Sequence, residues 1–138
     1  MCARSAALTI GSLLALTLGG AGSLSAQASA TAGWQASPAA TLKGALRSVS
    51  AAQERYFAAN RRYAASVDRL GVRPESGVRV DILGASATGW QARATHQSQP
   101  GRSCVVFVGS LGSVEAPRTD GDREMAGEEG IPLCDRMR

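Results

Sequence analysis

The amino-acid sequence predicts an α+β domain in which one long N-terminal amphipathic helix packs on an antiparallel sheet of three to four strands. Two changes of pattern support this fold class. Apolar residues recur at helical spacing through residues 39–60, and beyond Gly71 the apolar period changes to two. A helix with an apolar stripe and a sheet with an apolar face each need a cover, so we expect them to bury these surfaces against each other.

The predicted helix begins at Ser37-Pro38, where the serine can cap free amides and the missing N–H of the proline does no harm. Its apolar stripe ends in aromatic residues, and a further tyrosine follows in a short helical or turn segment that Gly71 ends. We interpret these aromatic residues as core side chains rather than as a ligand cage. The predicted core anchors are Leu46, Val49, Tyr56, Phe57, Tyr63 and Trp90.

Three strands are predicted at residues 78–82, 90–96 and 104–108, where apolar and polar residues alternate. The short turn-forming links between them indicate an antiparallel meander with one buried face. Residues 109–130 are rich in glycine, proline and acids and are predicted to form an irregular loop. Loops of this length are uncommon in compact domains unless they are functional or tethered.

Residues 1–28 are predicted to be a secretory signal peptide. An uncharged stretch over residues 6–24 follows Arg4 and leads to Ala26-Gln27-Ala28, which fits a signal-peptidase cleavage pattern. The alternative, a retained membrane anchor, is disfavoured by four glycines and a short apolar core, since a span needs roughly 20 apolar residues. We therefore expect a flexible linker at 29–37, a globular domain at 38–138, and a periplasmic or secreted location reached through a Sec-type signal.

After cleavage, Cys104 and Cys134 are the only cysteines, and two thiols in an exported chain most simply form one disulfide. The bridge would contribute about 3–4 kcal/mol on the chain-entropy estimate. Two unrelated free thiols are the alternative. A zinc site is disfavoured, because His96 is the only histidine and the chain has no C-x-x-C motif.

Charge is distributed unevenly. Residues 29–105 carry ten Lys/Arg and four acids, whereas residues 107–138 carry four Arg and seven acids. A basic half can indicate nucleic acid or an anionic membrane as a partner. Here the arginines are spread among alanines with few aromatic residues beside them, which favours a solvated surface. We expect no nucleic-acid partner and no stable membrane insertion after cleavage of the signal.

No catalytic residue and no cofactor is predicted, because His96 is the only histidine that could serve as a base and its strand face also carries Trp90. Alternating carboxylates in a loop can bind Ca²⁺. The weak candidate ligands are Asp120, Asp122 and Glu124. The EF-hand pattern fails, however, since Met125 stands at the turn-glycine position and Ile131 at that of the closing glutamate. A small soluble periplasmic ligand-binding domain, with Ca²⁺ in this loop, is the alternative function.

Several motifs occur together in one order: an aromatic helix end, a Gly-Trp strand and a pair of cysteines enclosing a variable loop. The residues concerned are Glu54, Tyr56-Phe57, Asn60, Tyr63-Ala64, Leu70, strand 78–82, Gly89-Trp90, Ala92, Ala94, His96, Cys104 and Cys134. Over residues 39–135 this arrangement resembles the globular head of type IV pilins and pseudopilins. The resemblance implies a helix packed on an antiparallel sheet, with the cysteine-bracketed loop facing partners.

The front of the chain departs from that family. No acidic residue precedes Glu54, and Gly33 and Pro38 interrupt any continuous helix, so the filament-assembly chemistry of pilins is not carried over. We predict an exported, non-enzymatic protein acting through protein–protein contacts, an accessory or minor component of a type IV pilus or a type II secretion-like system. A genuine minor pilin, processed by prepilin peptidase, stays open as an alternative. The expected contact residues are Gly109, Glu115, Arg118, Asp120, Asp122, Glu124 and Glu128.

Overall fold

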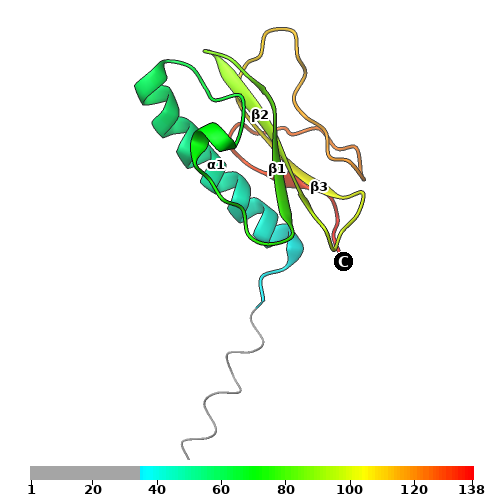
Figure 1. Ribbon diagram of the computed structural model, residues 1–138. Helices are drawn as coiled ribbons and strands as arrows, with labels where there is room; N and C mark the ends of the chain where they lie inside the picture. Colours follow the sequence, from blue (N-terminus) through cyan, green and yellow to red (C-terminus); the bar gives the residue numbers. More distant parts are fainter. Residues whose placement is uncertain (1–34) are drawn as a thin grey trace, which may run out of the picture. The chain divides into compact units, whose positions relative to one another are not determined.

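The computed structural model describes residues 35–138 (Figure 1). The elements in chain order are α1 (Pro38–Asn60), a 3₁₀ turn η1 (Asp68–Leu70), β1 (Val78–Ala85), β2 (Gly89–His96), β3 (Ser103–Gly109) and β4 (Leu133–Cys134). The predicted signal peptide and the first part of the predicted linker lie outside the described residues. Within residues 35–138, no helix has the length and apolar character needed to cross a membrane.

Helix α1 confirms the expected helical segment and its start, whereas its 23 residues do not show a long N-terminal helix. The Ser37 hydroxyl accepts a hydrogen bond from the Ala40 N–H at 3.2 Å, and Pro38 stands in the first turn. The helix comprises 23 residues and ends at Asn60. The capping residue Arg61 has a left-handed backbone (φ 56°), and its N–H donates to the Phe57 carbonyl. The serine cap and the left-handed residue thus bound the helix on both sides.

The four strands form one antiparallel sheet in the order β1-β2-β3-β4. The three predicted strands are confirmed. The short β4 is a fourth, which agrees with the expected number of three to four strands. One row of residues crosses all four strands: Val80 lies opposite Ala94, Ala94 opposite Cys104, and Cys104 opposite Cys134. The row lies on the face that α1 covers, because most of these residues belong to the core cluster that also contains Leu42 and Leu46.

The core lies between α1 and the sheet. Leu46, Val49 and Trp90 are fully buried there, as the sequence predicts. The alanines Ala92 and Ala94 of β2 are also fully buried, and their small side chains leave room for the leucines of the helix.

The expectation for the helix end needs correction. Tyr56 and Phe57 are only partly buried and lie outside the core cluster, and Tyr63 packs at its margin. The reason is local: the chain turns back after α1, and the ring of Phe57 stacks on the ring of Tyr63, with centroids 4.7 Å apart. These aromatic residues therefore stabilise the turn after the helix rather than the centre of the domain.

The buried polar side chain of Gln53 ties the helix to the returning chain. Its Nε2 donates to the Ala64 carbonyl at 2.8 Å, and its Oε1 accepts from the Ala64 N–H at 2.7 Å. Gln53 and Ala64 are both buried. The amide therefore satisfies both backbone groups of one residue, which water cannot reach.

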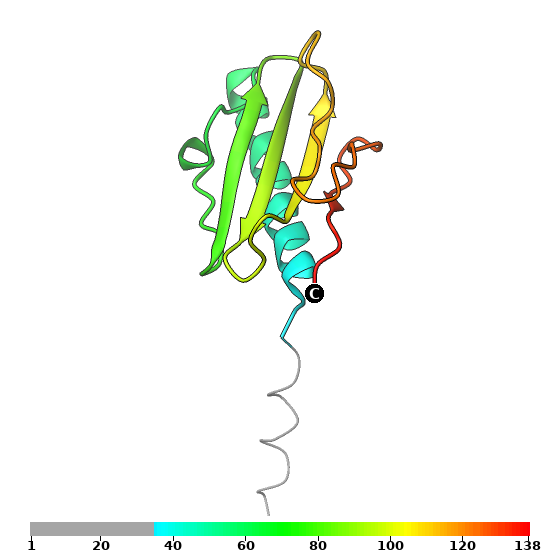
Figure 2. The ribbon, with the colours of Figure 1, turned by 90° about the vertical axis from the view of Figure 1, so that its right-hand side faces the viewer.

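The prediction of a single buried face is wrong. Figure 2 shows the segment after β3 crossing in front of the sheet, on the side opposite α1. Val105 on that side is fully buried, as is Thr119 of the crossing segment, and Ala126 of the same segment is 3% exposed. The side chain of Gln91 donates to the Glu115 carbonyl at 2.8 Å. The sheet therefore lies between α1 and a second, irregular layer.

Candidate interaction surface

The bracketed loop, residues 109–130, leaves the sheet at the end of β3 and returns to it at β4. Cys104 and Cys134 face each other directly across these two strands and form the predicted disulfide. Both ends of the excursion are therefore fixed at one edge of the sheet.

Asp135 links the loop to the edge of the sheet. Asp135 is 3% exposed, and its carboxylate accepts hydrogen bonds from the backbone N–H groups of Ser103, Gly121 and Asp122 at 2.8, 2.9 and 2.6 Å. Burial acts to raise the pKa of Asp135, but the amides of Asp122 and Gly121, the Thr119 side chain and the Ser103 amide together hold this pKa below its ordinary value. The ionised side chain thereby binds the loop to the sheet edge.

Sequence reasoning missed Asp135. The donors that surround it are mostly backbone amides, which leave no residue pattern in the sequence. Its position directly after the second cysteine was the one available signal.

Two of the predicted contact residues face the sheet instead of the solvent. Asp120 forms an ion pair with Arg93 at 3.1 Å, and Asp122 forms one with Arg102 at 2.8 Å. Hydrogen bonds from the Arg136 amide and from Arg102 lower the pKa of Asp122. These arginines belong to β2 and to the β2–β3 turn, so the two carboxylates hold the loop in place.

Two of the three candidate Ca²⁺ ligands are already engaged in these ion pairs. Asp120 and Asp122 each engage a different arginine, and Glu124 is exposed. Among residues 35–138, no group of three or more His, Cys, Asp or Glu is placed to hold a metal ion.

The loop contains a small hairpin that the sequence did not reveal. Arg118 and Met125 form an isolated antiparallel bridge. The Thr119 N–H donates to the Glu124 carbonyl at 2.9 Å, and the Glu124 N–H donates to the Thr119 hydroxyl at 3.1 Å. The buried Thr119 thus closes the hairpin that presents Met125.

The predicted contact residue Gly109 has a structural role. Its φ is +65°, and a Cβ added there would collide with the carbonyl oxygen of Thr88. Its N–H donates to Glu129 Oε1 at 2.7 Å. Gly109 therefore forms the tight exit from β3 and offers no side chain to a partner.

The outer surface of the loop is apolar with acidic neighbours. Met125 is 46% exposed, and Ile131, the residue that follows the loop, is 56% exposed. They line an open groove of about 360 Å³. Its lining residues are Glu124, Met125, Gly127, Glu128, Ile131, Pro132 and Leu133.

The structure thus brings two of the predicted contact residues, Glu124 and Glu128, to one groove. It places Glu115 and Arg118 elsewhere on the loop, where they form a loose pair at 3.9 Å. Sequence reasoning did not name Met125 and Ile131, which line this groove, among the expected contact residues. The signal for them was present, since Met125 follows Glu124 and Ile131 follows Glu128-Glu129-Gly130, so that each large apolar residue stands next to polar sequence.

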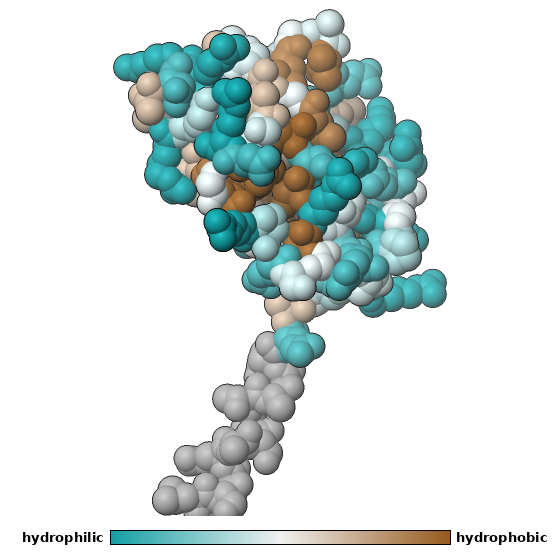
Figure 3. Space-filling view, viewed as in Figure 1, coloured by the Kyte–Doolittle hydropathy of each residue, from teal (hydrophilic) through white to brown (hydrophobic). Residues whose placement is uncertain are grey.

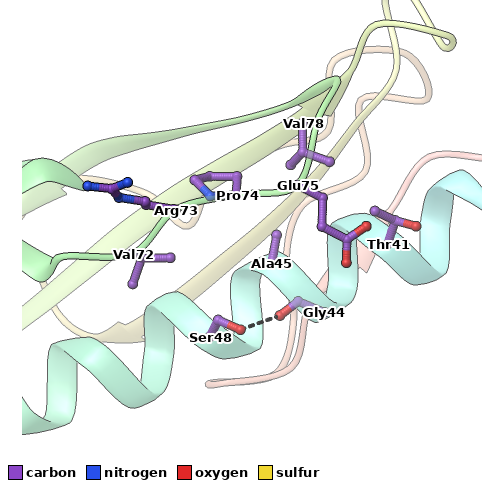
Figure 4. A pocket seen from close by; sticks show the side chains of 9 residues that line it. All are labelled: Thr41, Gly44, Ala45, Ser48, Val72, Arg73, Pro74, Glu75 and Val78. Atoms are coloured by element: carbon purple, nitrogen blue, oxygen red, sulfur yellow. Dashed lines mark hydrogen bonds between the residues drawn. The ribbon is translucent and has the colours of Figure 1, made fainter.

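A second pocket lies between α1 and the chain that precedes β1 (Figure 4). Its volume is about 150 Å³, below the 300–1,000 Å³ typical of ligand sites. Its titratable side chains are Arg73 and Glu75, and the hydroxyl of Ser48 donates to the carbonyl of Gly44. The Ser48 hydroxyl is therefore hydrogen-bonded within the helix.

The only histidine of the chain lies at the end of β2. His96 Nδ1 accepts a hydrogen bond from the Ser98 N–H at 3.1 Å and contacts the Ser98 hydroxyl at 2.7 Å. Both contacts are exposed and belong to the turn after β2, and no carboxylate among residues 35–138 hydrogen-bonds to the ring. A nucleophilic serine would need a histidine that a third group orients.

No protein-family model matches this chain. A search of curated proteins found no match either.

Proposed function

We propose that this chain is an exported, non-enzymatic protein with a pilin-like head, which acts through protein–protein contacts made by the bracketed loop. In this proposal it is an accessory or minor component of a type IV pilus or of a type II secretion-like machine. The partner is another subunit of that machine, and no nucleic acid or cofactor takes part.

The architecture supports the proposal in outline. A single helix covers one face of an antiparallel sheet, and a disulfide brackets a loop at the C-terminal side, in the order that the resemblance to pilin heads implies. The resemblance rests on the sequence motifs, and the fold is compatible with it.

The observation that carries the proposal is the contrast between the two sides of the bracketed loop. Its inner side is fixed by Asp135, by the two aspartate–arginine pairs and by the disulfide. Its outer side exposes Met125 beside acidic residues, and Ile131, the residue that follows the loop, lines the same groove. A preorganised loop loses little conformational freedom on binding, and exposed apolar side chains within a polar rim are typical of interaction sites.

The loop surface can be tested with point variants that leave the fold intact. Met125→Ser with Ile131→Ser should abolish capture of envelope proteins by the purified chain, read by mass spectrometry after cross-linking. Val114→Ser is the matched control, because Val114 is 58% exposed, close to the 56% of Ile131, and does not line the groove. Equal capture by the double variant and the control would remove the groove from the proposal.

Export is tested separately by the mass of the N-terminus and by the cell fraction that contains the protein. A soluble chain that starts near Ser29 or Thr31 supports an exported head. A membrane-bound chain cut within the first dozen residues would replace this proposal by that of a genuine minor pilin, processed by prepilin peptidase.

A further inference from the structure

The outer edge of β1 is a second surface, separate from the bracketed loop. Among residues 35–138, β1 pairs with β2 alone and forms one edge of the sheet. Figure 3 shows a brown apolar strip in the middle of the face, over the place that β1 occupies in Figure 1. The large apolar side chains of this strand are Val78, Val80, Ile82 and Leu83. The edge is eight residues long, enough to accept another strand.

The register shows which backbone groups of β1 point outward. The Gln97 N–H donates to the Gly77 carbonyl at 2.9 Å, so these two residues form a hydrogen-bonded pair. In an antiparallel ladder every second pair has this geometry. Arg79 and Asp81 therefore direct their backbone groups to β2, whereas Val80 and Ile82 direct theirs away from it.

Two further observations agree with this assignment. Val78 lies two residues before Val80, so its backbone groups point in the same direction as those of Val80. Its N–H points away from β2 and donates to the Glu75 carbonyl at 3.0 Å. In the part of the chain that the structure describes, no turn or loop segment hydrogen-bonds to the backbone of Val80 or Ile82. The middle of the edge therefore offers unused donors and acceptors, beside a groove that it shares with residues 65–68.

We infer that this edge pairs with β1 of a second copy of the chain, antiparallel about a two-fold axis at Val80. Val80 then lies opposite its own counterpart, and Val78 lies opposite Ile82 of the second copy on the helix-covered side. On the other side, Arg79 lies opposite Asp81 of the second copy, and Asp81 opposite Arg79. The two-fold axis therefore produces two identical pairs of opposite charges, as expected for an isologous contact.

The charges also select this register over its neighbours. A shift of two residues in one direction places Asp81 opposite Asp81, and a shift in the other direction places Arg79 opposite Arg79. Like charges directly opposite each other are destabilising. A shift of one residue turns the apolar side chains to the wrong face.

The ion pairs within one copy do not oppose the contact. Arg79 lies 3.0 Å from Asp81 of its own chain, but the Arg79 side chain is 78% exposed, and exposed pairs contribute little. Asp81 also lies 3.6 Å from Arg93. In the dimer, Asp81 lies between Arg93 of its own chain and Arg79 of the second copy.

The first test measures association by analytical ultracentrifugation. The sample is the protein purified from its own host, with whatever N-terminus the host leaves on it. The wild type should dimerise with rising concentration. Arg79→Asp and Asp81→Arg should each weaken the dimer about tenfold or more, because two symmetric pairs turn from attractive to repulsive. The double variant Arg79→Asp/Asp81→Arg should restore it. Arg47→Asp, the same charge change on the exposed face of α1, should leave it unchanged, and circular dichroism verifies that each variant is folded.

The second test reads the register directly. A mixture of Arg79→Cys and Asp81→Cys chains should form an intermolecular disulfide much faster than either variant alone, because only the mixture places two cysteines directly opposite each other. A wild type that stays monomeric at every accessible concentration would overturn the inference. Association that survives Arg79→Asp, or cross-linking that is equal in the mixture and in the single variants, would also overturn it.

Discussion

Asp135 and Ser103 exchange two hydrogen bonds across the edge of the sheet. The Asp135 N–H donates to the Ser103 carbonyl at 2.9 Å, and the Ser103 N–H donates to Asp135 Oδ2 at 2.8 Å. The first bond extends the pairing of β3 and β4 by one residue beyond Cys134. The second ends it, because the carboxylate takes the place of a backbone acceptor and also binds the amides of Gly121 and Asp122.

Asp135→Asn should lower the free energy of unfolding by roughly 1–3 kcal/mol, because the new NH₂ group faces backbone donors that then lack an acceptor. Urea denaturation at pH 7 measures this change. Asp68→Asn is the control, since Asp68 is an exposed acid in η1, and we expect a change within about 0.5 kcal/mol there. Equal effects of the two substitutions would contradict the anchoring role of Asp135.

The same carboxylate predicts a pH dependence of stability. The pKa of Asp135 is lowered in the folded state, so folding favours its ionised form. Its contribution is fully present above the unfolded-state value of 3.8 and is lost as the pH falls through the lower folded-state pKa. Asp122 acts in the same direction.

Thermal unfolding between pH 7 and pH 2 measures this dependence. We expect a plateau at neutral pH and a decline below about pH 4. Asp135→Asn should make the decline shallower. A decline of the same steepness in wild type and variant would show that other groups cause it.

Comparing Gly109 with Gly112 separates two costs of adding a side chain at Gly109. One cost comes from the steric collision, and the other from the left-handed backbone conformation. Gly109 and Gly112 both have positive φ, at +65° and +72°, but an added Cβ meets the Thr88 carbonyl only at Gly109 and open space at Gly112. Gly112→Ala should cost about 1 kcal/mol for the left-handed conformation alone. Gly109→Ala should cost at least about 1 kcal/mol more, because backbone must move. Chemical denaturation of both variants provides the comparison, and equal losses would contradict it.

Gln53→Leu should be strongly destabilising. It leaves the buried N–H and carbonyl of Ala64 without partners, which we expect to cost at least about 2 kcal/mol in urea denaturation. Gln99→Leu is the matched control, because Gln99 also bonds both backbone groups of a single residue, Arg138, but in an exposed position. A loss at Gln53 no greater than at Gln99 would show that Ala64 finds other partners.

Periodicity predicted most of the regular structure, since α1 and the first three strands each carry several residues of one period. β4 has only two residues, too few for a pattern, and its place follows from the disulfide pairing with β3. The second layer was harder to foresee. Val105 and Val106 are both fully buried, so β3 is covered on both faces, and its near-continuous apolar run was the signal for this.

The candidate site was predicted in location but only partly in residues. The cysteine spacing and composition marked the loop, yet charge alone could not separate Asp120 and Asp122, which bind arginines beneath the loop, from Glu124 and Glu128, which stand beside the exposed groove. That separation depends on which side of the loop each carboxylate faces. It therefore depends on tertiary structure.

The bracketed loop begins and ends on two adjacent strands. It contributes the buried Thr119 and Ala126 to the layer over Val105, whereas the layer that α1 forms on the other face does not depend on it. For such a closed excursion, each doubling in length costs only about 0.6 kcal/mol of closure entropy. Provided that the contacts around Asp135 are kept, the tip of the loop can lengthen, shorten or change composition while the core keeps its register. New recognition properties can therefore arise in this loop by insertion and deletion as well as by substitution, without a change in the helix and the strands.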